Sequence, residues 1–251
     1  MDKFSLKNHV VLITGASSGI GRSCAIEASK MGATCIITGR SEEELTKTKN
    51  LCETSTEIFV GDLTNHDVIK KLVTTLPNLD GVVHCAGITN PWPIKFLKPE
   101  HIKQMFDINF NAPVLLTTEL LQKNKINTSA SFIFISSISA QHPYFGGATY
   151  ASSKAAIEAF SKSLAIEMAP KKIRSNVVRP GLVKTRMFDE AKDASVDSEN
   201  FDQYEKFYPL GFGEPEDVSN AVCFLLSKES KWITGIDLKM DGGLVLNSKK
   251  N

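Results

Sequence analysis

The chain has 251 residues, of which 42% are hydrophobic and 23% charged, so it is long enough to bury a sizeable core and has a globular composition. Its 29 basic and 28 acidic residues leave a formal net charge of +1, which gives no reason to expect nucleic acid or a membrane as a partner. Its five cysteines lie far apart without a C-x-x-C pair, so we expect reduced thiols and no bound metal. The sequence shows no secretory signal and no apolar run of 18 residues, so we expect a cytoplasmic protein.

Strand and helix signals alternate along the chain. Short β-branched runs predict strands at 10–14, 34–39, 57–60, 81–84, 131–136, 173–178 and 236–240. Helical periodicity predicts helices at 19–31, 42–52, 66–76, 99–122, 149–168 and 215–227, with Pro113 expected to kink or end a segment of the fourth. This alternation predicts a single α/β domain over residues 1–251, built on a doubly wound parallel sheet with helices on both faces.

A glycine-rich loop follows the first predicted strand. Gly15, Gly19 and Gly21 permit a tight turn and a close approach of the backbone, and a helix opens directly after them. The free N–H groups and dipole of such a helix N-terminus bind pyrophosphate. The spacing is G-x-x-x-G-x-G, which differs from the commoner G-x-G-x-x-G fingerprint of dinucleotide sites.

The end of the second predicted strand bears on the choice of nucleotide. An acidic side chain there would bind a ribose 2′-OH and select NAD. This chain has Gly39 followed by Arg40, and a planar guanidinium suits a 2′-phosphate, so the pattern favours NADP(H). Ser41 can add a hydrogen bond. The alternative is a solvated Arg40 that pairs with a glutamate among residues 42–44.

Three side chains in the middle of the sequence can converge on one carbonyl oxygen. Ser137 closes the strand run SFIFISS, and Tyr150 and Lys154 lie four residues apart in ATYASSK. Residues at this spacing share one helix face, so the ammonium can lie beside the phenol and bring its pKa down toward neutrality. A hydroxyl at the carboxyl end of a strand points into the crevice where open α/β sheets bind ligands.

With these motifs in view, the chain resembles the short-chain dehydrogenase/reductase family over residues 6–246. The resemblance rests on TGASSGIG, GDLT, HCAG, INFNAP, Ser137, Tyr150, Lys154, RPG and the tail ITGIDLKMDGG. The stretch GEPEDVSNAVCFLLS is most similar to the 3-oxoacyl-carrier-protein reductase type and to its sugar- and steroid-dehydrogenase relatives. The resemblance implies a Rossmann-type fold, catalysis by Asn109, Ser137, Tyr150 and Lys154, and a homotetramer formed by the helices at 99–122 and 149–168 and the C-terminal segment.

The resemblance also implies a set of cofactor-binding residues. These are Gly15, Ser17, Ser18, Gly19, Ile20, Gly21, Arg40, Ser41, Asp62, Leu63, Ala86, Gly87, Tyr150, Lys154, Pro180, Gly181, Val183 and Thr185. In this set Asp62 would accept a hydrogen bond from the adenine amine, although a helix N-cap is its alternative role. Pro180 and Gly181 would lead into a loop that holds the nicotinamide amide, or would form a plain turn.

Two further positions qualify the resemblance. Asn109 matches the family position for an asparagine that holds a helix distortion and a water near Lys154, although Asn111 lies close by. His84 and Cys85 stand where the family usually carries two asparagines. We expect a strand-end histidine and a small buried thiol at these positions.

The stretch 184–213 has no clean period and is expected to be a substrate lid. It is rich in apolar residues, namely Phe188, Phe201, Tyr204, Phe207, Tyr208, Leu210 and Phe212. These residues could line an apolar substrate pocket, or pack within the loop or against another subunit.

The sequence therefore predicts an NADP(H)-dependent enzyme that reversibly reduces a ketone to a secondary alcohol, with NAD(H) as the second choice of cofactor. A carrier-bound 3-oxoacyl chain is one candidate substrate, and a steroid or a sugar or polyol is the alternative. The basic pair Lys171–Lys172 could help to dock an acidic carrier, but solvated surface lysines are the favoured interpretation of it. A different class, a nucleotide-binding sensor or interaction protein without catalysis, also occurs on this type of fold.

Overall fold

The computed structural model describes residues 3–193 and 204–247, and these contain one parallel sheet of seven strands. The strands are β1 (Val10–Thr14), β2 (Thr34–Gly39), β3 (Thr56–Val60), β4 (Leu79–His84), β5 (Ile126–Ile135), β6 (Arg174–Pro180) and β7 (Asp237–Met240). Their order across the sheet is β3-β2-β1-β4-β5-β6-β7. The predicted fold class is confirmed, and the direction of winding reverses between β1 and β4, where such sheets bind ligands at the carboxyl ends of their strands.

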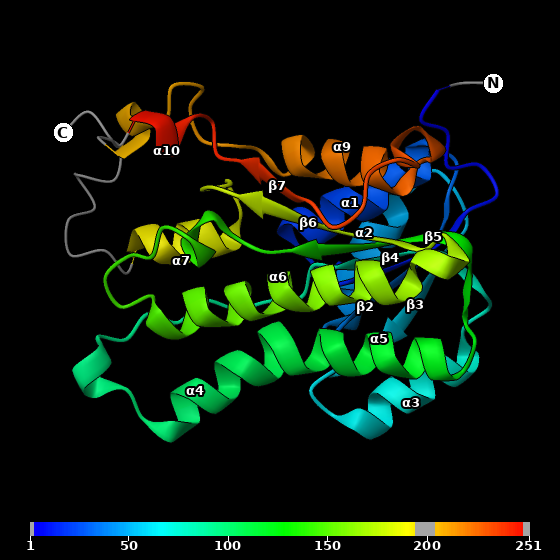
Figure 1. Ribbon diagram of the computed structural model, residues 1–251, viewed down its shortest axis with the longest axis horizontal. Coiled ribbons are helices and arrows are strands. Elements are labelled where there is room, and N and C mark those ends of the chain that lie inside the picture. Colours follow the sequence, from blue (N-terminus) through cyan, green and yellow to red (C-terminus); the bar gives the residue numbers. More distant parts are fainter. Residues whose placement is uncertain (1–2, 194–203, 248–251) are drawn as a thin grey trace.

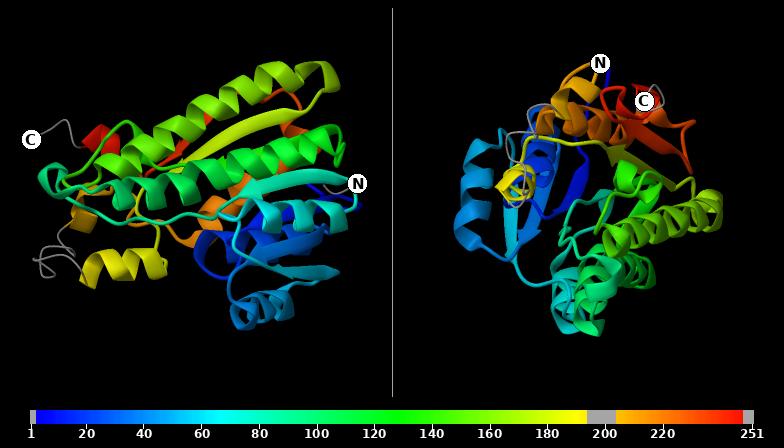
Figure 2. Two further views of the ribbon diagram at one scale, coloured as in Figure 1. Left: turned by 90° about the horizontal axis from the view of Figure 1, so that it is seen from below. Right: turned by 90° about the vertical axis from the view of Figure 1, so that its left-hand side faces the viewer.

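Helices cover both faces of the sheet (Figures 1 and 2). One face carries α1 (Gly19–Lys30), α2 (Glu42–Leu51) and α9 (Pro215–Leu226). The opposite face carries α3 (His66–Thr75), α4 (Pro99–Phe106), α5 (Ala112–Gln122) and α6 (Ala148–Met168). The short helices α7 (Arg186–Asp193) and α10 (Leu244–Asn247) lie at the end toward which β6 and β7 point. In these described ranges, no helix has the length and apolarity needed to cross a membrane.

Two apolar clusters hold the helices against the sheet. Val11 and Ile13 of β1 face the cluster beneath α1 and α9, whereas Leu12 between them faces the cluster beneath α3, α5 and α6. All three side chains are fully buried, which explains why the strand sequence is a continuous apolar run rather than an alternating one.

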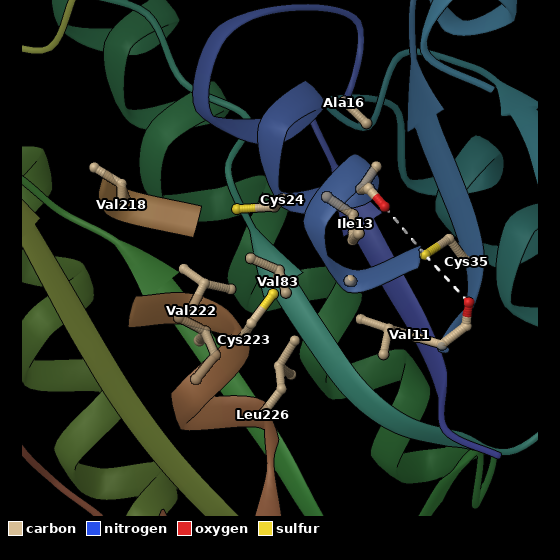
Figure 3. Close-up of a cluster of buried hydrophobic side chains, with 14 of the residues drawn as sticks. Val11, Ile13, Ala16, Cys24, Cys35, Val83, Val218, Val222, Cys223 and Leu226 are labelled. Carbon is tan, nitrogen blue, oxygen red and sulfur yellow. Dashed lines mark hydrogen bonds between the residues drawn. The ribbon is translucent and has the colours of Figure 1, made fainter. Parts of the chain in front are cut away.

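The first cluster contains three of the cysteines, as Figure 3 shows for Cys24, Cys35 and Cys223. Burial raises the pKa of Cys35 and of Cys223 to about 12, so neither is reactive near neutral pH. All five cysteines of the chain are free thiols. The cysteines in the cluster therefore serve as small apolar side chains in the core.

Most predicted elements agree with the structure within two residues. Strand β5 is an exception, because it begins at Ile126, where it pairs with Leu79 before a register shift. The polar sequence of this extension carried no strand signal. The predicted helix at 99–122 is divided into α4 and α5 by the π-helix Asp107–Asn111. Pro113 lies in the first turn of α5, where a missing N–H costs little. Helices α7 and α10 were not predicted.

Candidate active site

Tyr150 and Lys154 extend from one face of α6 toward the carboxyl ends of the central strands. The Lys154 ammonium lies 5.7 Å from the centroid of the Tyr150 ring, as the i, i+4 spacing predicted. Its Nζ donates a hydrogen bond of 2.8 Å to the carbonyl oxygen of Ile135, the last residue of β5. Lys154 is therefore buried and held against the strand that leads to Ser137.

Ser137 lies two residues after the end of β5 and caps the short turn Ile138–Ala140. Its Oγ accepts a hydrogen bond of 3.1 Å from the backbone N–H of Ser139. The Ser137 side chain also lies on the side of the Tyr150 phenol, whose pKa it lowers. The structure thus brings together all three groups that were expected to face a carbonyl oxygen.

The protonation of these groups differs from the expected pattern. Burial raises the pKa of Tyr150 to about 12, although the Ser137 side chain opposes this effect. Burial also lowers the pKa of Lys154 to about 8, against the opposing influence of Cys85 and Glu158. The expected lowering of the phenol pKa by Lys154 is not found in this arrangement, in which desolvation is the largest influence on Tyr150 and the ammonium donates to Ile135. At neutral pH Tyr150 is a protonated phenol, which can donate a proton.

Asn109 occupies the π-helix between α4 and α5 and is almost fully buried. Its side chain accepts a hydrogen bond from the N–H of Ile88 at 2.9 Å and donates one to the Ile88 carbonyl at 3.0 Å. It also donates to Ser153 Oγ on α6 at 3.1 Å. Asn109 therefore joins the irregular turn to α6 and to the segment after β4. The neighbouring Asn111 instead bonds to Asp107 on an exposed surface.

The glycine loop packs so closely that side chains are excluded from it. A Cβ on Gly21 would lie 2.3 Å from the carbonyl oxygen of Gly15, and one on Gly15 would lie 2.7 Å from Ala86. Gly15 and Gly19 adopt positive φ angles of 66° and 53°. Ser17 lies in this loop, Ser18 is the N-cap residue of α1, and Ile20 packs against the core below.

The first turn of α1 has no side-chain cap and no acidic residue. Its orphan N–H groups and positive dipole end are therefore available to an anion. Together with the glycine cradle, this helix end fits the pyrophosphate of a dinucleotide.

Arg40 follows β2 and is exposed, and it forms no ion pair with any of the described residues. The suggested pairing with the neighbouring glutamates is wrong, because Glu43 pairs with Lys47, and Glu44 with Lys47 and Arg22. A Cβ on Gly39 would make only ordinary contacts, with the nearest atoms at 3.5 Å. Ser41 caps α2 by accepting from the Glu44 N–H at 3.3 Å.

Asp62 lies after β3, with its carboxylate turned back on the chain. Its Oδ1 accepts from the N–H and from the hydroxyl of Thr64, at 2.9 and 2.8 Å. These bonds lower the pKa of Asp62, chiefly through the Thr64 N–H, and the charge of Arg40 lowers it further. Asn65, not Asp62, caps α3, so the N-cap alternative for Asp62 is wrong. Leu63 packs against the core below α3 and α5.

Ala86 and Gly87 continue β4 past the sheet. The Thr14 hydroxyl accepts from the N–H groups of Cys85 and Ala86, both at 3.2 Å. A Cβ added to Gly87 would lie 3.3 Å from both Lys154 Nζ and Asn109 Oδ1. Because glycine has no Cβ, the backbone can pass close to these two side chains. The segment therefore joins the glycine loop to Lys154.

His84 is the strand-end residue of β4, and it is buried and neutral. Its Nε2 lies 3.0 Å from Thr117 Oγ1, and its ring stacks on Phe134 with a centroid distance of 4.7 Å. Burial lowers its pKa to about 3. Cys85 is only half-buried, so the expectation of a buried thiol is met in part.

The segment after β6 runs beside the glycine loop. Pro180 ends β6, and Val183 forms an isolated bridge with Gly213. The Gly181 N–H donates a hydrogen bond to the carbonyl oxygen of Met240. A Cβ added to Gly181 would lie 3.1 Å from the Tyr208 ring.

Thr185 directly precedes α7. Its methyl group is so close to Gly19 that a Cβ added to this glycine would lie only 3.1 Å from it. The predicted cofactor residues of this segment thus lie against those of the first loop. All of them gather at the carboxyl edge of the sheet.

The described aromatic residues of 184–213 pack chiefly with one another. Phe188 and Phe212 have ring centroids 5.1 Å apart, and Tyr208 and Phe212 have theirs 5.0 Å apart. The Tyr208 hydroxyl accepts from the Leu182 N–H at 3.1 Å. Packing within the loop is therefore the role that these contacts support. Phe201 lies outside the described residues.

Two supporting residues escaped the sequence analysis. Arg22 on α1 donates to the Ser17 carbonyl and to Glu44, with 2.6 Å between Arg22 Nη2 and Glu44 Oε2, and so holds the glycine loop against α2. Glu158 lies one turn beyond Lys154 on α6. The i, i+4 rule that linked Tyr150 to Lys154 would have placed Glu158 on the same face.

Known proteins are similar to this chain over nearly its whole length. The sequence family described as enoyl-(acyl carrier protein) reductase matches residues 15–245. The 3-oxoacyl-acyl-carrier-protein reductase FabG of Rickettsia bellii is 38% identical over 242 residues, which cover 96% of this chain and 98% of the relative. The D-erythrulose reductase of Gallus gallus is 31% identical, with 97% and 98% of the two chains covered.

Solved structures give the same result. A short-chain dehydrogenase/reductase of the glucose/ribitol dehydrogenase type from Brucella melitensis superposes with a TM-score of 0.90 at 25% identity, over 97% of this chain and 99% of the other. A protein assigned as an NAD(P)-dependent gluconate 5-dehydrogenase from Beutenbergia cavernae, with NADP bound at low occupancy, gives 0.87 at 27% identity over 98% and 100%. The chain therefore belongs to the short-chain dehydrogenase/reductase family and is an NAD(P)-dependent oxidoreductase acting on CH–OH groups.

Proposed function

We propose that the protein is an NADP(H)-dependent reductase that converts a ketone to a secondary alcohol and can run in reverse. The observation that carries this proposal is the convergence of Ser137, Tyr150 and Lys154 beside a glycine cradle at the carboxyl edge of the sheet. A sensor without catalysis would have no need for a half-buried phenol with a buried hydroxyl and a buried ammonium gathered beside it. Their arrangement favours the enzyme over the non-catalytic alternative.

In the proposed reaction the side chains handle the oxygen of the substrate. Tyr150, protonated at neutral pH, donates its proton to the carbonyl oxygen as negative charge develops there. Ser137 donates a hydrogen bond to the same oxygen and orients it. Lys154 holds a positive charge beneath the phenol, which stabilises the tyrosinate left by the transfer. Asn109 fixes the segment at Ile88 against α6, and so keeps Lys154 in place.

The cofactor would lie along the same edge. The residues of the glycine loop and the start of α1 would hold the pyrophosphate, Asp62 and Leu63 the adenine, and Ala86, Gly87, Tyr150 and Lys154 the ribose near the nicotinamide. The backbone near Val183, which follows Pro180 and Gly181, would hold the carboxamide, and Thr185 would bind a phosphate or the amide. When bound, the nicotinamide would supply the hydride for the carbonyl carbon.

The preference for NADP(H) over NAD(H) rests on the end of β2. Gly39 puts no carboxylate at the ribose 2′ position, and Arg40 is exposed without an ion-pair partner in the described ranges. The influence of Arg40 on Asp62 indicates that its charge lies on the side of the proposed adenine site. An unpaired guanidinium there suits a 2′-phosphate.

For the substrate we favour a 3-oxoacyl chain on an acidic carrier, with a steroid or a sugar or polyol as the alternative. The Rickettsia relatives named for 3-oxoacyl-acyl-carrier-protein reduction support this choice, and Lys171 and Lys172 are exposed beside β6. We further propose that the chain is one domain in which α7 and the residues from 204 to 213 form the described part of a lid.

The test is turnover of NADPH with a panel of ketones that includes a 3-oxoacyl thioester, a sugar ketone and a steroid ketone. The proposal expects oxidation of NADPH to depend on at least one of them, with fastest turnover for the thioester. Binding of NADPH without turnover on any member of the panel would favour the non-catalytic alternative. The same panel with NADH measures the cofactor preference.

We also propose that the protein assembles as a homotetramer. The outer face of α6 leaves Ala155, Ala159 and Ile166 exposed, and it borders a groove of about 810 Å³ beside the exposed Phe145. A helix that covers only its own sheet needs a single apolar face, so this second stripe suggests a contact between copies. Light scattering at micromolar concentration should give four times the chain mass of 27.5 kDa. A mass near that of one chain would contradict assembly, and replacing exposed Ile166 by Glu should lower the mass.

A further inference from the structure

Behind the proposed catalytic groups, Glu158 forms a buried polar network on the inner face of α6. Its Oε1 accepts a hydrogen bond of 2.8 Å from Ser136 Oγ and lies 3.7 Å from Arg179 Nε. The side chains of Glu158 and Arg179 are only 8% and 10% exposed. Arg179 Nε has no hydrogen-bond partner in the described part of the chain, so its contact with Glu158 is one of charge.

This carboxylate joins three elements that carry site residues. Ser136 directly precedes Ser137, and its hydroxyl also lies 3.3 Å from the carbonyl oxygen of Lys154. Arg179 directly precedes Pro180 on β6. Glu158 is thus the point at which α6, the end of β5 and the end of β6 meet through side chains.

The charges around Lys154 give Glu158 a second effect. The Lys154 ammonium lies 5.7 Å from the centroid of the Tyr150 ring, and Glu158 follows Lys154 by four residues on α6 and so shares its helix face. The charges of Cys85 and Glu158 both favour the protonated form of Lys154 against burial. Glu158 in turn faces Ser136, Arg179, Asp237 of β7, and Lys162 on its own helix. Burial raises the pKa of Glu158 and Asp237 adds to this, while Ser136, Arg179 and Lys162 oppose it. Lys162 itself is paired with Asp237 at 2.6 Å.

We propose that Glu158 is a positioning residue for the reduction, which acts through Lys154. Its carboxylate, tied to Ser136 and Arg179, sets the position of α6 against β5 and β6 and supplies the negative charge that keeps the Lys154 ammonium protonated. This inference rests on the proposed function, in which that ammonium binds the ribose and supports Tyr150.

The test uses the purified full chain and the Glu158→Gln variant, which keeps the shape and a hydrogen-bond acceptor but removes the charge. NADPH affinity is measured by the fluorescence of the bound cofactor between about pH 6 and about pH 10, because this range spans the titration of a perturbed lysine. Affinity should fall on the alkaline side as Lys154 loses its proton, and Lys154→Ala should abolish this fall. Glu167→Gln, which removes an exposed charge from the same helix, is the matched control.

Removal of the Glu158 charge disfavours the ammonium, so the pKa of Lys154 should fall. The loss of affinity should therefore begin at lower pH in Glu158→Gln than in the wild type. Glu167→Gln should follow the wild type. Glu158→Asp, which keeps the charge but is shorter, should restore most of the wild-type profile, and it serves as the second variant if Glu158→Gln does not fold.

An unshifted profile in Glu158→Gln, or a uniform loss of affinity at every pH, would overturn the inference, because a packing role alone predicts no displacement. If Glu158→Asp showed the profile expected for loss of the charge, the inference would also fail. Wild-type protein that binds neither NADPH nor NADH would overturn the proposed function itself, and with it this inference. The two failures are therefore distinguishable without any knowledge of the substrate.

Discussion

Replacing Tyr150 by phenylalanine should lower the turnover number for ketone reduction by about 10²- to 10⁴-fold, the usual effect of losing one positioned acid. The substitution removes the phenolic hydroxyl but keeps the ring, whose centroid lies 5.7 Å from the Lys154 ammonium. Because burial keeps the phenol protonated well above neutral pH, the missing group is a proton donor rather than a base in the direction of reduction.

The control for this variant is its binding of NADPH. No phosphate contact is assigned to the phenol, so the dissociation constant should stay within a few-fold of the wild-type value. Thermal unfolding of the two proteins should also be similar, because the ring volume is unchanged. Near-wild-type turnover by Tyr150→Phe on an active substrate would show that the proton comes from another group.

Replacing Arg40 by alanine should weaken NADPH binding by about 10- to 100-fold, the range for losing a hydrogen bond to a charged group. NADH binding should barely change, because NADH has no 2′-phosphate. Arg40 is exposed and pairs with no acidic residue of the described chain, so its removal should leave the fold intact. Titration of both cofactors into both proteins measures the effect.

The matched control is Lys49→Ala, which removes an exposed cation from the nearby helix α2. If general attraction between a basic surface and the cofactor dominated, both variants would lose similar affinity, and the loss would vanish at high salt. If wild-type protein bound NADH more tightly than NADPH, the assignment of Arg40 to the 2′-phosphate would be wrong.

The order of the elements could be predicted because the signals for it are local. The continuous apolar run of β1 indicates a strand buried on both faces, and the glycines after it indicate a turn that no side chain can enter. The break in the helix at 99–122 could be predicted only in part. Pro113 indicates an irregularity, whereas the π-helix before it depends on the contacts of Asn109 with Ile88 and Ser153, which lie far away in the sequence.

The sequence by itself determined that Tyr150 and Lys154 share a helix face, that Ser137 closely follows a strand and that a glycine-rich loop follows β1, because each depends on residues close together in the chain. Only the tertiary structure decided how these groups are charged. The spacing of Tyr150 and Lys154 suggested a lowered phenol pKa, but burial beneath β5 reverses the direction. The link from Glu158 to Ser136 and Arg179 also arises only when α6 packs on the sheet. Desolvation and long-range charge depend on what surrounds a group in space, and local sequence carries no record of that.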